Sequence, residues 1–348
     1  MPSSCKAQAA PNIALIKYWG KDDEDLNIPS NDSISLTLDT TVLCSTCLVK
    51  PSSTQTDEFF LNNSPSTVTS RLQRQLTACR PNSEPHFLSI ISKNNFPTAA
   101  GLASSASGYA ATAVALCNYF SCNSDVSVVA RLGSGSACRS VHGGLVRWLS
   151  SDPFNAEQVL PASDLSNLIV VVIVFSAETK SVSSTEGMRR TQSTSPLFSG
   201  RKERAHKRLE EMIDAFKSRD FPTVFRLTME DSNDLHEMCA TSVPPINYLS
   251  SSSEKLKTAV HDINNDNGSP LVAYTFDAGC NGFLILERCN LNKVVSHLAL
   301  TFPDLNNLSH QLLEDSSPPS VLLCIDAEEV RSVYISGVGS GPLVQCEP

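Results

Sequence analysis

The stretch that decides the fold is the run "LSNLIVVVIVF" at residues 165–175. It is continuously apolar and rich in valine and isoleucine, which is typical of a strand buried on both faces. We place a domain boundary at its end, so that residues 1–175 form one domain and residues 176–348 a second. The length agrees, because 348 residues are more than one hydrophobic core usually serves.

The sequence before this run predicts a β-rich section with one helix. The segment "SISLTLDTTVLCSTCLVK" (33–50) alternates and is rich in β-branched residues, which predicts strands joined near Asp39. Residues 101–120 change from small polar residues to an alanine-rich run, which predicts a tightly packed helix.

The sequence after the run predicts an α+β domain. An amphipathic helix follows from the helical spacing of Ala205, Leu209, Met212, Ile213 and Phe216. Pro222 is expected to open a second helix, serines 250–253 to cap a third, and a strand to end at Asp277. A strand partner, a helix from Leu291 and a late strand "SVLLCID" complete the expected domain.

Composition narrows the function. With 41% hydrophobic and 18% charged residues, and no apolar segment long enough to cross a bilayer, we expect a soluble protein. A net charge of -9 with scattered lysines and arginines argues against nucleic-acid binding. A small anionic ligand is compatible with that charge, since it needs only a few converging donors.

The cysteines indicate a reducing compartment. Twelve in 348 residues are too few for a disulfide scaffold, and the N-terminus lacks the apolar core of a secretory signal. Cys44 and Cys47 have no second pair or histidines at zinc-ligand spacing, so we interpret them as strand residues.

Three small-residue stretches are candidate anion sites. The first, "NNFPTAAGLASSASG" (94–108), combines glycine, alanine and clustered serines with the start of a helix, which suits a phosphate. It lacks the Walker A lysine. The alternative is close helix packing through small residues, which explains the serines less well.

The second stretch, "RLGSGSACRSVHGG" (131–144), repeats the pattern and adds Arg139, whose planar cation suits a carboxylate or phosphate. A surface salt bridge is the alternative for that arginine. The third stretch, "KSVSSTEGMRR" (180–190), sets Lys180 beside Ser183, Ser184 and Thr185, and alone it is also compatible with a flexible loop.

Two charged residues stand at positions that need an explanation. Lys17 follows an apolar run in "NIALIKYWGK" (12–21), and a buried cation needs a partner. Asp277 interrupts "LVAYTFDAGCNGFLILE" (271–287), where it is either a turn residue or a carboxylate facing a cleft. We expect Asp277 to be the partner of Lys17, with the glycines after it letting the chain turn away.

Five segments in order resemble the signature segments of the diphosphomevalonate decarboxylase family, within the GHMP kinase superfamily. They are "NIALIKYWGK", "NNFPTAAGLASSASG", "GSGSACRS", "SSTEGMR" and "YTFDAG". The resemblance implies an α+β GHMP kinase fold, with an N-terminal α/β domain that has a left-handed crossover, a C-terminal ferredoxin-like domain and the active site in the cleft between them. It also implies a cytoplasmic homodimer of isoprenoid and sterol synthesis. That enzyme uses ATP and Mg²⁺ to convert mevalonate 5-diphosphate into isopentenyl diphosphate, ADP, phosphate and carbon dioxide through 3-phosphorylation.

The resemblance also implies roles for individual residues. The catalytic set is Asp277 at the substrate 3-hydroxyl, Lys17, Arg139 on the substrate carboxylate, and Asn12. The substrate diphosphate is assigned to Tyr18, Lys21, Ser134, Gly135, Ser136 and Ser184. The nucleotide is assigned to Asn95, Pro97, Ala99, Gly101, Ser104, Ser105, Ser107 and Lys180, with Ser105 also at the metal.

The sequence departs from the family pattern at three places. Cys280 and Gly282 replace the usual proline and alanine after the "DAG" segment, which is expected to loosen the turn behind Asp277. Asp32 replaces serine or asparagine, and Thr185 replaces an arginine of some bacterial members, so it does not inherit that diphosphate contact. Other GHMP kinases, a monophosphate decarboxylase and a catalytically silent relative are the alternative functions.

Overall fold

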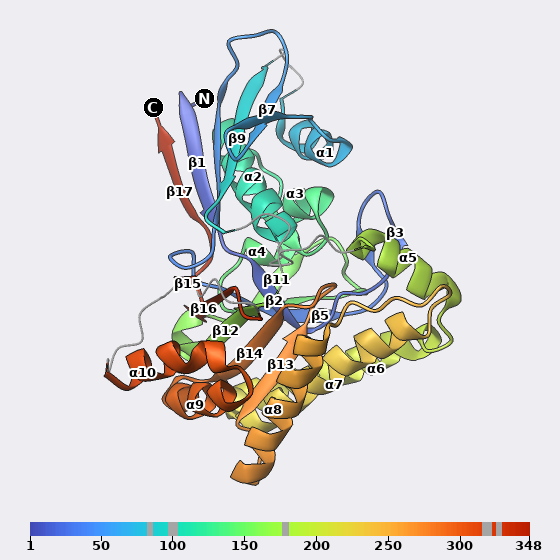
Figure 1. The fold of residues 1–348 in the computed structure, drawn as a ribbon. Helices are drawn as coiled ribbons and strands as arrows, with labels where there is room; N and C mark the ends of the chain where they lie inside the picture. Colours follow the sequence, from blue (N-terminus) through green and yellow to red (C-terminus); the bar gives the residue numbers. More distant parts are fainter. Residues whose placement is uncertain (82–85, 97–103, 176–180, 315–321, 325–328) are drawn as a thin grey trace.

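The computed structural model describes residues 1–81, 86–96, 104–175, 181–314, 322–324 and 329–348. The described strands form three sheets and one two-stranded ribbon, with helices on several faces (Figure 1). The ribbon pairs β3 (Lys21–Asp23) with β4 (Ile28–Pro29).

The six-stranded sheet joins the two ends of the chain. Its strand order is β17 (Leu343–Glu347), β1 (Ser4–Ala9), β6 (Ser45–Pro51), β9 (Leu88–Asn94), β7 (Glu58–Leu61) and β8 (Ser64–Ser66). The neighbours are antiparallel except β7 and β9, which are parallel. Cys5 of β1 and Cys346 of β17 are paired in register and joined by a disulfide, which the cysteine composition did not predict.

Helices cover one face of this sheet. Helix α2 (Ser104–Phe120) packs on β1 and β6, and α1 (Ser70–Cys79) and α3 (Val126–Gly133) pack on α2. The small side chains at 101–120 predicted a tightly packed helix. The alanines of α2 are fully buried, so they allow the helix to pack closely against the sheet. The prediction of a helix there is confirmed for the described residues from Ser104 onward.

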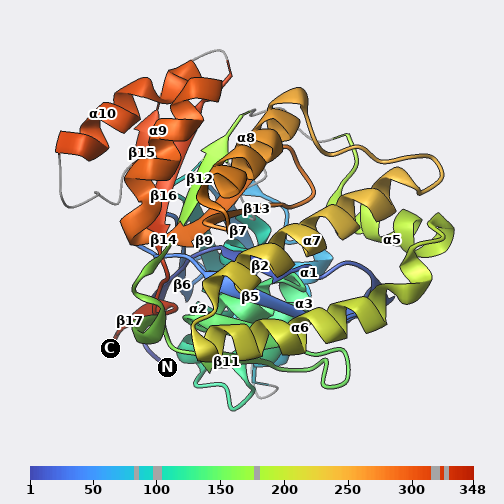
Figure 2. The ribbon, with the colours of Figure 1, turned by 90° about the horizontal axis from the view of Figure 1, so that it is seen from below.

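The four-stranded sheet lies in the middle of the molecule. Its order is β11 (Ala156–Leu160), β10 (Leu145–Trp148), β5 (Ser33–Thr37) and β2 (Asn12–Ile16), all antiparallel. The short helix α4 (Ala137–Ser140) contacts its strands from above in Figure 1, and α6 (Arg201–Ser218) and α7 (Phe221–Ala240) contact them from below. Figure 2 shows α6 and α7 side by side across β2 and β5.

The apolar run at 165–175 forms β12 (Leu168–Val174), whose seven residues are all buried. It is the central strand of a five-stranded antiparallel sheet with the order β13 (Val272–Phe276), β14 (Gly282–Glu287), β12, β16 (Ser332–Gly337) and β15 (Leu322–Cys324). The buried strand was therefore predicted correctly.

Helices α8 (Ser251–Asn267) and α9 (Leu291–Thr301) pack on each other, and α8 also packs on β13. The remaining described helices are α5 (Ser184–Thr194), α10 (Asn306–Glu314) and four short 3-10 turns. The four helices predicted after residue 200 are confirmed, with Pro222 in the first turn of α7, a serine capping box at the start of α8 and Leu291 as the first residue of α9. All five predicted apolar positions of α6 are buried.

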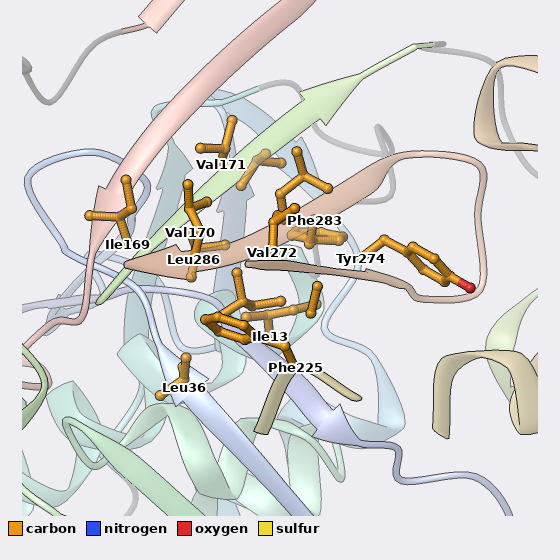
Figure 3. Close-up of a cluster of buried hydrophobic side chains, with 14 of the residues drawn as sticks. Ile13, Leu36, Ile169, Val170, Val171, Phe225, Val272, Tyr274, Phe283 and Leu286 are labelled. Atoms are coloured by element: carbon orange, nitrogen blue, oxygen red, sulfur yellow. The ribbon is translucent and has the colours of Figure 1, made fainter. Parts of the chain in front are cut away.

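The largest hydrophobic core spans two sheets. Figure 3 shows Ile13 of β2 and Leu36 of β5 on the side of the five-stranded sheet that carries Leu286, with Phe225 of α7 beside Ile13. The predicted division at residue 175 stays a prediction. The strand β12, which ends the first predicted domain, pairs with β14 and β16 of the second, and β17 of the second pairs with β1 of the first.

A buried charge network joins α6 and α7 to β2. Asp231 of α7 is fully buried and accepts hydrogen bonds from Arg201 Nη1 at 2.6 Å, Arg201 Nη2 at 2.9 Å and Arg208 Nη1 at 3.0 Å. It also accepts the backbone N–H of Lys17 at 2.7 Å. Four hydrogen bonds thus compensate the burial of this carboxylate.

The substitution Asp231→Ala should lower the free energy of unfolding by about 3–5 kcal/mol, because it removes the fully buried carboxylate that pairs with Arg201 and leaves this buried cation only Asp234. Urea denaturation followed by circular dichroism measures the change. The control is Glu211→Ala, which removes the half-exposed ion pair with Arg226 and should cost no more than about 1 kcal/mol. Equal losses in the two variants would contradict a structural role for the buried network.

Candidate active site

A cavity of about 510 Å³ lies where β2, three helix N-termini and the end of β13 meet. Its lining includes most of the residues that the sequence singled out. These are Asn12, Lys17, Tyr18, Lys21, Ser104, Ser105, Ser134, Gly135, Ser136, Arg139, Ser184 and Asp277.

Two predicted nucleotide residues do not line this cavity. The Asn95 side chain accepts the backbone N–H of Cys44 at 2.8 Å, and Ser107 is buried with its hydroxyl 2.7 Å from Ser45 Oγ. Their contact with a nucleotide stays a prediction. Pro97, Ala99, Gly101 and Lys180 lie outside the described residues.

Lys17 and Asp277 form the ion pair that the sequence predicted. Lys17 Nζ lies 2.7 Å from Asp277 Oδ1, and the lysine side chain is almost fully buried whereas the carboxylate is about one-third exposed. Burial lowers the pKa of Lys17, and the charge of Asp277 acts in the opposite direction. Within the described part of the chain, Asp277 Oδ2 has no hydrogen-bond partner, so one carboxylate oxygen remains available in the cavity.

The position of Lys17 is fixed through its backbone. Its N–H donates to Asp231, and its carbonyl accepts from Arg201 Nη2 at 2.8 Å and from Asn31 Nδ2 at 2.9 Å. Arg201 and Asp231 belong to the buried network between α6 and α7. The network therefore determines where the Lys17 ammonium lies relative to Asp277.

Arg139 is a buried cation on α4, with only 2% of its surface exposed. Its guanidinium donates to Asn12 Oδ1 from Nε and Nη2, each at 3.2 Å, and to the hydroxyls of Ser33 at 2.5 Å and Ser35 at 3.1 Å. It has no ion pair with any described residue, so the surface salt bridge considered as its alternative is wrong. A buried guanidinium held only by neutral groups is a site for an anion.

Asn12 orients this guanidinium. Its Nδ2 donates to the carbonyl of Ser136 at 2.9 Å and to Ser140 Oγ at 2.8 Å, which directs its Oδ1 toward Arg139. Both Asn12 and Arg139 line the cavity. The Asn12 side chain thus connects the backbone of the 131–144 stretch to the guanidinium of Arg139.

Helix N-termini supply further donors for an anion. Ser104 and Ser105 begin α2, and Ser183, Ser184 and Thr185 form the start of α5, with Ser183 accepting the N–H of Glu186 as the N-cap. The free N–H groups and the positive dipole end of each helix favour negative charge. The third stretch, which alone was compatible with a flexible loop, is ordered as a helix from Ser184 onward.

Tyr18 and Gly135 form a tight contact in the cavity wall. A β-carbon at Gly135 would lie 2.6 Å from the Tyr18 hydroxyl, so only glycine fits there without moving the ring. The Tyr18 hydroxyl is buried without a hydrogen-bond partner among the described residues. Burial raises the pKa of Tyr18, so the hydroxyl stays protonated and is a free donor.

Arg71 of α1 is the residue that the sequence analysis missed. It lines the cavity and donates from Nη2 to Thr185 Oγ1 at 3.3 Å. Lys21 lies in the same wall with its Nζ 2.7 Å from Asn27 Oδ1, and burial followed by the charge of Arg71 lowers the pKa of Lys21. Among the described residues that line the cavity, four of the five charged side chains are cations, although the chain carries a net charge of -9.

The turn behind Asp277 is held at three points, and the loosening expected from Cys280 and Gly282 stays a prediction. The N–H of Gly279 donates to the Asp277 carbonyl at 2.7 Å, Ser253 donates to the Cys280 carbonyl at 2.6 Å, and Asn281 accepts the N–H of Phe175 at 2.9 Å. A β-carbon at Gly282 would lie 2.3 Å from a terminal methyl carbon of Leu256, so an alanine there requires that side chain to shift.

Family models match both halves of the chain. The diphosphomevalonate decarboxylase-like N-terminal domain matches residues 9–160, and the mevalonate 5-diphosphate decarboxylase C-terminal domain matches residues 170–345. The chain belongs to the diphosphomevalonate decarboxylase family. The human diphosphomevalonate decarboxylase is 39% identical, and the match covers 98% of this chain and 93% of the human protein.

Solved structures agree with this assignment. The mevalonate diphosphate decarboxylase from Trypanosoma brucei superposes with a TM-score of 0.88 at 34% identity, and the match covers 98% of each chain. A structure described as MDDEF in complex with MVAPP, AMPPCP and magnesium has a TM-score of 0.81 at 31% identity, with 99% of this chain and 100% of that chain covered. The family resemblance and the two-domain GHMP-type fold predicted from sequence are thereby confirmed.

The substitution Tyr18→Phe should leave the free energy of unfolding unchanged within about 0.5 kcal/mol, because the lost hydroxyl has no protein partner. It should weaken the binding of inorganic pyrophosphate, measured by calorimetry, by removing one donor to the anion.

The matched control is Tyr274→Phe. The Tyr274 hydroxyl lies 3.0 Å from Asn233 Nδ2 and 3.2 Å from His261 Nε2. This variant should lose about 1 kcal/mol of stability and bind pyrophosphate normally. The opposite pattern in the two variants would show that the Tyr18 hydroxyl does not serve the anion.

Proposed function

We propose that this protein is an ATP-dependent carboxy-lyase that converts mevalonate 5-diphosphate into isopentenyl diphosphate, ADP, phosphate and carbon dioxide, in the mevalonate pathway of isoprenoid and sterol synthesis. The observation that carries the proposal is the composition of the cavity wall, where Asp277 is the one carboxylate among four cations in the described lining. A substrate with two anionic ends and a hydroxyl between them matches this wall.

The substrate diphosphate is assigned to the side of the cavity where Tyr18, Lys21 and Arg71 lie. Tyr18 offers an unpartnered hydroxyl, and Lys21 and Arg71 offer charge. The serines of the α4 and α5 N-termini add neutral donors, namely Ser134, Ser136 and Ser184, with the backbone of Gly135 between the first two. Thr185 acts through Arg71, whose guanidinium it contacts.

The substrate carboxylate is assigned to Arg139. The guanidinium is already oriented by Asn12, Ser33 and Ser35, so little conformational entropy is lost when it binds an anion. Hydrogen bonds neutralise the carboxylate without a covalent or metal bond. The carboxylate is thus free to leave as carbon dioxide.

Asp277 is assigned to the 3-hydroxyl. Its Oδ1 is held by Lys17, and its Oδ2 is available to accept the hydroxyl proton as the hydroxyl oxygen attacks the terminal phosphorus of ATP. The 3-phosphate then leaves with the electron pair of the C–O bond. The electrons of the bond to the carboxylate form the new double bond as carbon dioxide departs.

ATP and Mg²⁺ fit the start of α2. Ser104 and Ser105 line the cavity at a helix N-terminus, which favours phosphate, and the Ser105 hydroxyl is a suitable single protein ligand for a magnesium ion whose other ligands are phosphates and water. The relative described with MVAPP, AMPPCP and magnesium supports this assignment. When bound, Mg²⁺ supplies charge neutralisation on the phosphates.

The substitution Asp277→Asn should reduce turnover by about 10²–10⁴-fold while both substrates still bind, because it removes the proton acceptor and keeps the shape. ADP and carbon dioxide are measured in the same reaction, and the wild type should release them one to one. The control is Asp262→Asn, an exposed carboxylate on α8, which should keep full turnover.

The products also separate the alternative functions. ADP release without carbon dioxide from mevalonate 5-diphosphate would favour another GHMP kinase, and turnover of the monophosphate alone would favour a monophosphate decarboxylase. Binding without any product would indicate a catalytically silent relative. Near-normal turnover by Asp277→Asn would refute the role assigned to that carboxylate.

The substitution Arg139→Lys should weaken mevalonate 5-diphosphate binding by roughly 10- to 100-fold, since a lysine cannot form the planar pair with a carboxylate. Isopentenyl diphosphate lacks the carboxylate, so its affinity should remain within about twofold of the wild type. Calorimetry with both ligands measures the difference. An equal loss for both ligands would place Arg139 at the diphosphate or in the fold.

Two further properties stay predictions. The cytoplasmic location and the homodimer are implied by the family resemblance. No helix in the described part of the chain is long and apolar enough to cross a membrane. Light scattering on the purified chain measures its oligomeric state directly.

A further inference from the structure

Three cysteine side chains converge at the end of α2 that lies away from the cavity. Cys79 is the last residue of α1, Cys117 lies in the last turn of α2, and Cys122 follows α2 by two residues. Their sulfur atoms all lie within 4.8 Å of one another. Helix α2 has 17 residues, so roughly 25 Å of helix separates its two ends, and the cluster is independent of the proposed active site.

The sulfur spacing matches a metal site. Cys79 Sγ and Cys117 Sγ lie 3.7 Å apart. A Zn–S bond of about 2.3 Å in a tetrahedron places neighbouring sulfurs about 3.8 Å apart. A disulfide needs about 2.05 Å. The observed separation excludes a disulfide and equals that of two ligands on one ion, and two thiols in an S–H···S contact lie at the same distance.

The hydrogen bonds around Cys122 Sγ also fit a metal ligand. The N–H of Ser124 donates to Cys122 Sγ at 3.4 Å, and the N–H of Cys122 donates to the Cys117 carbonyl at 2.8 Å. An N–H donor beside a ligand sulfur is the kind of outer contact that orients thiolates on a metal.

The cysteine cluster is accessible to an ion from the side of Cys122. Cys79 and Cys117 are buried among apolar side chains, whereas Cys122 is half-buried and reaches the surface. An ion held by the three sulfurs has an open position toward the side of Cys122, which water can occupy. Apolar packing explains the two buried cysteines. Cys122 Sγ in addition lies 3.8 Å from the Ala78 carbonyl of α1, which holds the third sulfur at the junction of α1 and α2.

We propose that Cys79, Cys117 and Cys122 form a trithiolate site for Zn²⁺, with water as the fourth ligand, that joins α1 to α2. Three thiols release their protons to solvent as three Zn–S bonds form, so no oxidant or reductant takes part. Among the residues that the structure describes, no other three His, Cys, Asp or Glu side chains bring their ligand atoms this close together. The site does not depend on the proposed decarboxylase activity.

The test uses the full chain, reduced with a phosphine, stripped by a chelator and titrated with Zn²⁺ against a chromophoric competitor. A parallel titration with Co²⁺ reports thiolate ligands through their charge-transfer absorption and tetrahedral geometry through the visible bands. We expect one ion per chain. Cys122→Ser is the decisive variant, because Cys122 is only half-buried and a serine there should not disturb the fold. This variant should bind Zn²⁺ more than about tenfold more weakly.

The control is Cys289→Ser, which removes an exposed thiol outside the cluster and should leave the affinity unchanged. Reduction also frees Cys5 and Cys346, but an ion bound there would survive the Cys122→Ser change. Urea denaturation of both variants without metal verifies that each is folded.

Several results would overturn the proposal. They are failure of the reduced wild type to bind Zn²⁺, binding that Cys122→Ser leaves unchanged, binding that Cys289→Ser abolishes, or a Cys79–Cys117 disulfide found by mass spectrometry in the protein as isolated. Loss of Zn²⁺ binding with ADP release intact in Cys122→Ser would support it and separate it from the active site.

Discussion

The ion pair between Lys17 and Asp277 is the constraint on which the candidate site depends. It joins a residue near the start of the chain to one 260 positions later, and Lys17 is almost completely removed from water. An isolated ammonium in such a place would cost several kcal/mol, so the carboxylate must lie within contact distance. The fold meets this requirement by packing β2 and β13 against the same helix, α7. The contacts that bury Lys17 are consequently the same contacts that bring the walls of the cavity together.

The parts of the fold predicted from sequence were those with strong local patterns. The apolar run of β12, the helical spacing in α6 and the proline and serine signals of α7 and α8 act within one element, so neighbouring residues reveal them. The pairing of Lys17 with Asp277 was predicted for a different reason, because a buried charge requires a partner and Asp277 was a carboxylate without an explanation at the end of an apolar strand.

What sequence reasoning missed depends on contacts between distant elements. Arg71 lies on an amphipathic helix, where an arginine normally faces solvent, and only the approach of α5 brings it into the cavity wall. The Cys5–Cys346 bond spans 341 positions and has no local signal. The hydrogen bonds of Ser253 and Asn281 behind Asp277 also join distant elements, and Ser253 lies outside the family segment.

The pairing of β17 with β1 has a consequence for synthesis on the ribosome. Strand β1 is made first, yet one of its two partners is the last strand of the chain (Figure 1). Until then one edge of β1 has unpaired backbone groups, and exposed edges of this kind favour association with other chains. The six-stranded sheet of the nascent protein therefore keeps an open edge until β17 has been synthesised. A nascent-chain chaperone that shields strand edges would act at this stage.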